Sequence, residues 1–203
     1  MFGQRSKQWM LALSLSLGCL LNAGATEVAG VKLDDAVQVA GNELKLNGAG
    51  IRYKAIFKVY VAALYLKEKK NTVPDVLAAQ GPRRVAITML RDLSNEDFGR
   101  GFMQGIQQNT DKSEKLKMTS QFMRFGELFA SVPELKKCDT MIVDWIPNQG
   151  TIVMLNGKKM GEPYPDLAFY NAILRIWLGE SPVDKGLKKA MLAEQDERSG
   201  NNR

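Results

Sequence analysis

GAGIRYKAIFKVYVAALYL, residues 48–66, is the stretch of sequence that most constrains the fold. From Ile51 onward it is rich in Val, Ile, Tyr and Phe, which favour β-strands. Arg52 stands at the head of this apolar run. A guanidinium that faces an apolar layer is costly without an anion, and it is also the side chain best suited to bind a carboxylate with two hydrogen bonds. The residues alone leave two interpretations of Arg52, an anion receptor or a sheet-edge residue that reaches water.

The segments on either side of this stretch predict short hairpins with helices between and after them. Asn47-Gly48 is typical of a tight hairpin turn, and Ser94 followed by Asp97 is typical of a helix start. Because the strands come in adjacent groups, we predict an α+β domain with an antiparallel sheet rather than a doubly wound one. The expected strands are 36–40, 43–46, 51–66, 84–90, 140–146, 151–155 and 158–160, and the expected helices are 73–80, 94–109, 114–130, 166–178 and 183–193.

The predicted helix 94–109 contains three glycines, Gly99, Gly101 and Gly105. Each costs a helix about 1 kcal/mol relative to alanine. We therefore expect these positions either to allow close packing against a neighbouring element or to leave room for a bound molecule.

The composition excludes several classes of site. The 203 residues are 45% hydrophobic and 25% charged, which is typical of a globular protein. The sequence has no histidine, so triads that need histidine and imidazole-ligated zinc or haem are excluded. Two cysteines are too few for a zinc-thiolate site, and no nucleophile elbow, phosphate-binding loop or CxxC motif is present. We therefore assign no catalytic residue, no metal ligand and no cofactor.

The N-terminus has the pattern of a secretory signal. Arg5 and Lys7 precede a short apolar segment, and Ala23-Gly24-Ala25 fits a cleavage site before Thr26. A lipoprotein signal ending at Gly18-Cys19 and an uncleaved anchor are the alternatives. We expect a signal peptide at 1–25 and one domain at 26–203, with its core at about 31–193 and a polar tail at 196–203. The protein would then be secreted, to the periplasm, with no membrane span after cleavage.

The charge argues against nucleic acid as a partner. The full chain carries a net charge of +6, from 28 basic and 22 acidic residues. Loss of Arg5 and Lys7 would leave 26 basic residues and a net charge of +4. The densest basic clusters, 67–70 and 185–189, are short and typical of solvated surfaces, so we predict no nucleic-acid binding.

Two motifs resemble the chalcone isomerase-like family, and in particular its bacterial secreted branch. The first is Gly48-Ala49-Gly50-Ile51-Arg52 with the run 57–66, and the second is 171–179 followed by Ser181-Pro182-Val183. The resemblance covers about 31–193. It implies an open-faced β-sandwich in which a helical layer packs on an antiparallel sheet.

The resemblance also implies a site. In plant chalcone isomerase a strand arginine polarises the substrate with help from a threonine, a tyrosine and an asparagine. Arg52 matches that arginine, whereas Tyr60 stands in place of the threonine, Phe98 in place of the tyrosine and Gly105 near the asparagine. With three of four polar positions changed, efficient flavanone formation is not expected.

Fatty-acid-binding members of the same fold offer a different function. Their arginine and tyrosine hold a carboxylate, which here implies Arg52 as the anion receptor and Tyr60 as its helper. Phe98 and Phe102 would line the cleft around the tail, although both also suit simple core packing. The partner would be a small amphipathic anion such as a fatty acid.

The fatty-acid interpretation depends on a reversal of the chain. Arg52 and Tyr60 would lie about 26 Å apart on one straight strand, so the chain must double back near Ala55-Ile56. We prefer a non-catalytic binder. An isomerase that uses Arg52 as the electrophile, with Tyr53, Tyr60 or Tyr65 as the proton carrier, and a structural protein with a filled cleft remain as alternatives. The sequence does not determine the oligomeric state.

Overall fold

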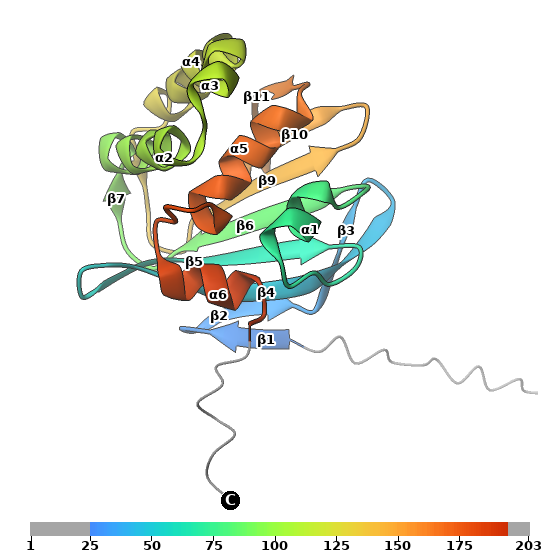
Figure 1. Ribbon diagram of the computed structural model, residues 1–203. Helices are drawn as coiled ribbons and strands as arrows, with labels where there is room; N and C mark the ends of the chain where they lie inside the picture. Colours follow the sequence, from blue (N-terminus) through green and yellow to red (C-terminus); the bar gives the residue numbers. More distant parts are fainter. Residues whose placement is uncertain (1–24, 195–203) are drawn as a thin grey trace, which may run out of the picture.

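The computed structural model describes residues 25–194, which form a curled antiparallel sheet with helices on one face (Figure 1). The strand order is β11-β10-β9-β6-β5-β4-β3, and every neighbouring pair is antiparallel. The predicted α+β architecture is therefore confirmed. The seven strands are β3 (Ala36–Val39), β4 (Asn42–Lys54), β5 (Phe57–Leu66), β6 (Arg83–Met89), β9 (Thr140–Ile146), β10 (Gly150–Leu155) and β11 (Lys158–Tyr164).

The remaining elements are six helices within the described residues and two small strand pairs. The small pairs are β1 (Ala25–Val28) with β2 (Val31–Asp34), and β7 (Leu93–Ser94) with β8 (Glu134–Leu135). The helices are α1 (Val73–Ala78), α2 (Asn95–Asn109), α3 (Lys112–Lys117), α4 (Thr119–Ala130), α5 (Leu167–Leu178) and α6 (Lys185–Met191). Within residues 25–194, no helix has the length and apolar character of a membrane span.

The central strand β5 is buried on both faces, which explains its nearly continuous apolar sequence. Tyr60, Ala62 and Leu64 face the main core under the helices. Val61 and Ala63 alternate with them and face a smaller cluster that includes Leu33 of β2. Because successive strand residues point to opposite faces, a strand covered on both sides needs apolar residues at every position.

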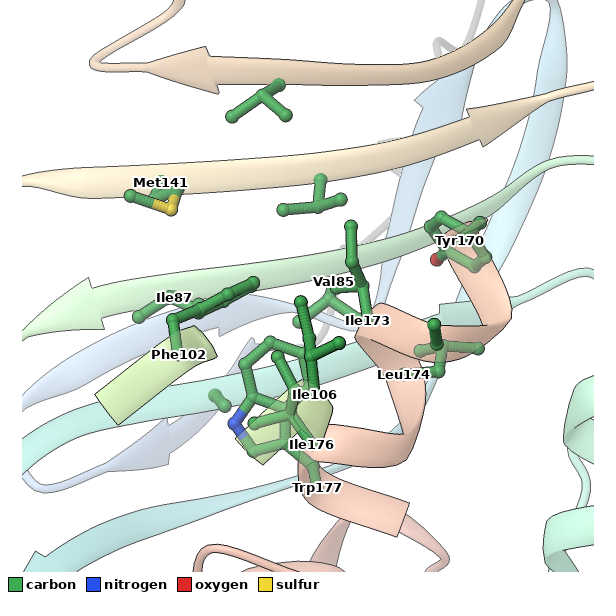
Figure 2. Packing of buried hydrophobic residues seen from close by; sticks show 14 of the residues in the cluster. Val85, Ile87, Phe102, Ile106, Met141, Tyr170, Ile173, Leu174, Ile176 and Trp177 are labelled. Atoms are coloured by element: carbon green, nitrogen blue, oxygen red, sulfur yellow. The ribbon is translucent and has the colours of Figure 1, made fainter. Parts of the chain in front are cut away.

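The main core lies between the sheet and helix α5 (Figure 2). Helix α5 is apolar around most of its circumference, and eight of its residues are buried. Ile173 and Trp177 lie among side chains from β6 and α2, including Val85 and Phe102 (Figure 2). Gly105 allows α2 to approach α5 closely, because a Cβ there would lie 2.8 Å from Ile176 Cγ2. At Gly105, the glycine therefore allows close packing against a neighbouring helix, which is one of the two expectations for the glycines of this helix.

The reversal required between Arg52 and Tyr60 is present. The predicted single strand 51–66 is wrong, because β4 and β5 are separated by a turn at Ala55-Ile56. Ala55 adopts a positive φ of 54°, which a tight hairpin turn requires. The register places Arg52 directly opposite Tyr60. No glycine marks this turn in the sequence, so local residue type did not indicate it.

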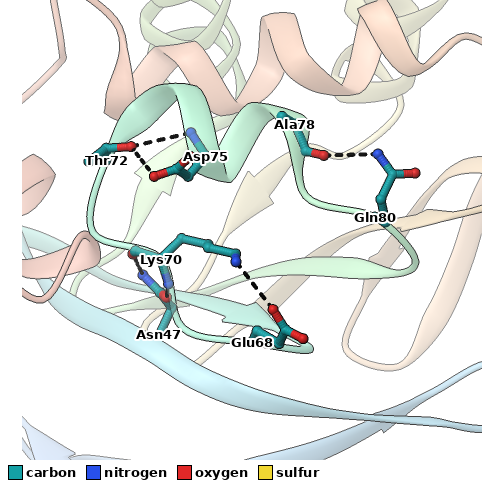
Figure 3. Close-up of polar contacts among 7 residues, drawn as sticks. All are labelled: Asn47, Glu68, Lys70, Thr72, Asp75, Ala78 and Gln80. Carbon is teal, nitrogen blue, oxygen red and sulfur yellow. Dashed lines mark hydrogen bonds and ion pairs between the residues drawn. The ribbon is translucent and has the colours of Figure 1, made fainter.

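The predicted hairpin turn at Asn47-Gly48 is also wrong, because these residues form an irregularity within β4. Asn47 is buried, and its side-chain amide accepts a hydrogen bond from Lys70 N at 2.7 Å and donates to Lys70 O at 2.9 Å (Figure 3). The amide also donates to Met191 O at 2.7 Å. These bonds to distant segments hold the irregularity in the strand and replace the expected turn.

Smaller differences concern the ends of elements. The predicted helix 114–130 is divided at Met118 into α3 and α4. Strands β1 and β2 were not predicted, whereas the start of α2 was, since the Ser94 side chain accepts a hydrogen bond from Asp97 N. The predicted signal peptide lies outside the described residues apart from Ala25, and the predicted tail 196–203 lies wholly outside them.

Candidate functional site

A cavity of about 320 Å³ opens between the β4–β5 hairpin, helix α2 and the end of α5. Its volume is at the lower end of the range of about 300–1,000 Å³ found for small-molecule sites. Apolar side chains form one part of the wall, and basic and amide side chains form another, together with one acid, Asp97, which lies 3.9 Å from Arg100. The apolar lining residues include Val59, Leu93, Phe98, Phe102, Ile176 and Val183, and the polar ones include Arg52, Lys54, Tyr60, Arg100, Gln104 and Gln108.

Arg52 lies on the cavity wall with its side chain 22% exposed. Its Nη1 is 3.9 Å from Asp184 Oδ2, which is an ion pair beyond hydrogen-bond distance. The Asp184 carboxylate also accepts backbone hydrogen bonds from Tyr53 N at 2.9 Å and from Leu187 N at 3.0 Å. Asp184 therefore caps α6 and anchors the hairpin. No carboxylate of the described residues lies within hydrogen-bond distance of Arg52, whose other polar neighbour is the Tyr60 hydroxyl.

Two other arginines of this sheet have close hydrogen-bond acceptors, although the buried Nε of Arg83 has none among the described residues. Arg84 makes a bidentate pair with Asp144, with both N–O distances at 2.7 Å. Arg83 is buried and donates from Nη1 to the carbonyls of Val76 and Leu77 at the end of α1. Both serve the fold, whereas Arg52 combines partial burial with a long ion pair beside a cavity. A bound carboxylate would complete its hydrogen bonding.

A second cavity of about 410 Å³ lies beside α1 and is lined by Arg83, Lys67 and Lys70. It is larger than the first, but Nη1 of its buried arginine already donates to the carbonyl groups at the end of α1, and only Nε has no partner among the described residues. Lys70 there is paired with Glu68 at 3.2 Å (Figure 3). The cavity beside Arg52 is therefore the better candidate site.

Tyr60 is buried beside Arg52 and points its hydroxyl toward α5. The hydroxyl oxygen accepts a hydrogen bond from Trp177 Nε1 at 3.0 Å. Burial raises the pKa of Tyr60 to about 12, although the Trp177 hydrogen bond and the charge of Arg52 oppose that rise. The hydroxyl therefore stays protonated at neutral pH and keeps its own hydrogen for donation.

Phe98 and Phe102 belong to both the core and the cavity wall. Their ring centroids are 5.8 Å apart, and Phe102 meets Trp177 edge-on at 5.7 Å. Phe98 also packs against Phe129 of α4 at 5.3 Å. Both residues therefore line the cavity and also pack in the core, as the two interpretations of them proposed.

Sequence reasoning missed the polar face of α2. Gln104 and Gln108, one turn apart, line the cavity together with Gly101 and Arg100. A Cβ at Gly101 would meet nothing within 4 Å, so this glycine leaves space at the cavity. The spacing of these residues along one helix face was the signal that could have indicated them. Lys54 was missed because nothing local shows that it lines the same cavity.

The cavity also bears on the filled-cleft alternative. That alternative expects no hollow beside Arg52, and the cavity there does not fit it.

Comparison with protein families gives a match to the family described as chalcone isomerase-like over residues 25–193. The chain belongs to the chalcone isomerase-like family. No curated protein sequence matches it. Among solved structures, a fatty-acid binding protein of Arabidopsis thaliana has a similar fold, with a TM-score of 0.64 and 16% sequence identity. The match covers 80% of this chain and 92% of the Arabidopsis chain, and at this identity it shows the shared fold alone.

The four positions that the chalcone isomerase-like resemblance implied all line the same cavity. Arg52, Tyr60, Phe98 and Gly105 come from β4, β5 and α2 and meet there. Phe98 has no hydroxyl and Gly105 has no side chain, so neither can donate a hydrogen bond to a developing oxyanion from these positions. Arg52 and Tyr60 are the polar members of the set.

Proposed function

We propose that this protein binds a fatty acid or a similar amphipathic carboxylate in the Arg52 cavity without catalysing a reaction on it. Arg52 receives the carboxylate and Tyr60 donates a second hydrogen bond. Phe98 and Phe102 contact the tail. The observation that carries the proposal is Arg52 itself, partly buried on an apolar-backed cavity, with its nearest carboxylate 3.9 Å away.

The physical chemistry of the cavity supports this ligand class. An arginine binds a carboxylate through two charge-assisted hydrogen bonds, which are stronger than neutral ones and gain further strength when they are shielded from water. Each methylene buried in the apolar part is worth about 0.8 kcal/mol, so a tail adds affinity with little demand on polar groups. The Arabidopsis protein of similar fold is named as a fatty-acid binding protein, which agrees with this choice.

The site of action belongs to the proposal as well. The basic and apolar pattern before Thr26 supports export, so the protein would meet its ligand in the periplasm or outside the cell. N-terminal sequencing of the protein recovered from its host would test this, because an intact Met1 would contradict cleavage.

Native mass spectrometry with added dodecanoate tests the binding role. We expect Arg52→Gln to lower dodecanoate affinity by about tenfold or more, because hydrogen bonds to charged groups contribute about 1.5–3 kcal/mol. The matched control is Arg124→Gln, an exposed arginine on α4 that removes the same charge away from the cavity. Dodecanol, which lacks the carboxylate, should bind the native and Arg52→Gln proteins alike.

Equal dodecanoate occupancy in the native and Arg52→Gln proteins would reject Arg52 as the receptor. The isomerase alternative retains one supporting observation, the cross-strand pair of Arg52 with protonated Tyr60 at the cavity. Turnover of a chalcone well above its spontaneous rate, abolished in Arg52→Gln, would favour the isomerase over the binder.

A further inference from the structure

The turn between β4 and β5 projects past the sheet and carries exposed apolar side chains. We call residues 53–58 the hairpin tip, and all six are exposed. Ile56 is 84% exposed, Phe57 is 56% exposed and Tyr53 is 40% exposed. Figure 1 shows the tip reaching out from the sheet at the left of the molecule. Ordinary packing does not require large apolar residues at the end of a projecting turn.

The charged residues of the hairpin tip are basic, and the acid that contacts the tip, Asp184, accepts the Tyr53 N–H and pairs with Arg52. Lys54 and Lys58 flank the apolar residues, and the Arg91 guanidinium lies over the Phe57 ring at 5.2 Å from its centroid. The sequence has no acidic residue between Glu43 and Glu68. Asp92, the acid next to Arg91, is paired with Lys136 at 3.6 Å. The apolar residues are therefore bordered by cations that carry no matching anion on the hairpin.

We infer that the hairpin tip docks on the surface of an anionic lipid bilayer. Ile56 and Phe57 enter the boundary between headgroups and acyl chains, and Tyr53 lies at headgroup depth, where aromatic rings with a polar end are favoured. Lys54, Lys58 and Arg91 contact the lipid phosphates. Apolar burial and attraction to anionic headgroups act together in such surface binding, and each alone is weak.

The hairpin tip also lies next to the mouth of the candidate cavity. Lys54 belongs to the tip and lines the cavity, and Arg52 is two residues before it on the same strand. A docked tip would bring the cavity mouth to the lipid surface, where an acyl chain could pass between bilayer and protein. This consequence rests on the proposed function, whereas docking itself rests on the residues of the tip.

Vesicle co-sedimentation tests the docking. The probes are vesicles of phosphatidylcholine alone and vesicles of phosphatidylcholine and phosphatidylglycerol in equal parts. We expect the native protein to bind the anionic vesicles, to bind less at high salt, and to bind neutral vesicles weakly. The double variant Ile56→Ser with Phe57→Ser should bind the anionic vesicles at least about tenfold more weakly. Lys58→Gln with Arg91→Gln should weaken binding to anionic vesicles selectively.

The matched control changes two equally exposed apolar residues away from the hairpin. Leu116 and Met123 are 69% and 64% exposed on α3 and α4, and Leu116→Ser with Met123→Ser should leave vesicle binding unchanged. Equal loss in this control would overturn the assignment to the hairpin tip. Absence of native binding to anionic vesicles would overturn docking altogether. Docking would also be overturned if the native protein self-associates with rising concentration and Ile56→Ser with Phe57→Ser abolishes that self-association but leaves vesicle binding unchanged.

Two further readouts separate this inference from the proposed function. Dodecanoate binding in free solution should survive Ile56→Ser with Phe57→Ser, and vesicle binding should survive Arg52→Gln. Loss of fatty-acid binding with docking intact would remove the ligand proposal alone. Loss of docking with fatty-acid binding intact would remove the membrane inference alone.

Discussion

Tyr60 shows how a single hydroxyl is tuned by neighbours that are remote in sequence. Its oxygen accepts the indole N–H of Trp177, which is 117 residues away, and its strand partner is Arg52. Burial is the largest cause of its raised pKa. The same surroundings that keep the hydroxyl protonated leave its hydrogen available for an acceptor in the cavity.

The raised pKa of Tyr60 predicts how stability depends on alkaline pH. The unfolded tyrosine loses its proton near pH 10, whereas the folded one keeps it to about 12, so the folded state binds more protons in that window. The free energy of unfolding of the native protein should therefore fall there by about 1.4 kcal/mol per pH unit from this residue. Tyr60→Phe should remove that part of the decline. Urea unfolding at intervals from about pH 9 to about pH 12 measures it.

Parallel stability curves for the native protein and Tyr60→Phe across that window would contradict the assignment. The comparison cancels the lysines and the other buried tyrosines, because both proteins share them.

Helix α6 illustrates the element scale, because its place on β4 is set by small residues on the strand. A Cβ at Gly48 would lie 2.1 Å from Ala190 O and 2.9 Å from Met191 O. A Cβ at Gly50 would lie 2.7 Å from the Ala190 side chain. Gly48 and Gly50 therefore allow α6 to pack closely on β4. Arg52 lies two residues after Gly50 on the same strand.

Gly48→Ala should displace α6 and destabilise the protein by about 3 kcal/mol, because the obstructing atoms belong to the backbone and have little room to move. Urea unfolding gives the change in free energy. The matched control is Gly126→Ala in α4, where an added Cβ meets nothing within 4 Å and should stabilise the helix by up to about 1 kcal/mol. A Gly48→Ala protein as stable as the native one would show that α6 does not depend on this close approach.

At the scale of the whole molecule, the cavity exists only because three segments that are distant in sequence come together. The hairpin supplies Arg52 and Tyr60, α2 supplies Phe98 and Gly101, and the segment after α5 supplies Val183. Its volume of about 320 Å³ limits how much of an acyl tail it can enclose.

This volume predicts a limit in the affinity of saturated fatty acids. Affinity measured by isothermal titration calorimetry should rise about fourfold for each added methylene, as about 0.8 kcal/mol of burial implies, and should level off once the tail fills the cavity. The methyl esters should bind more weakly throughout, because they lack the charge that Arg52 receives. Affinity that does not change with tail length from the shortest acids onward would place the tail outside the cavity.

Much of the fold could be predicted from the sequence because its signals are local. The apolar, β-prone run of β5, the Ser94 cap of α2 and the apolar α5 follow from residue preference, side-chain period and nearby hydrogen bonds. The motifs at 48–66 and 171–183 indicated the family, and the first of them indicated Arg52 as a candidate site residue. The grouping of strands was enough to exclude a parallel sheet.

The turns and the site were decided by tertiary structure. Asn47-Gly48 has the local chemistry of a hairpin, yet hydrogen bonds from Asn47 to residues 23 and 144 positions away keep it within β4. Ala55-Ile56 has no such chemistry, yet the chain turns there because β4 and β5 pair along their length. The sequence by itself determined that an arginine would stand at the head of an apolar, β-prone run. Only the folded chain decided that this arginine would lie beside Tyr60 on the wall of a cavity, because strand pairing and long-range packing fix those positions.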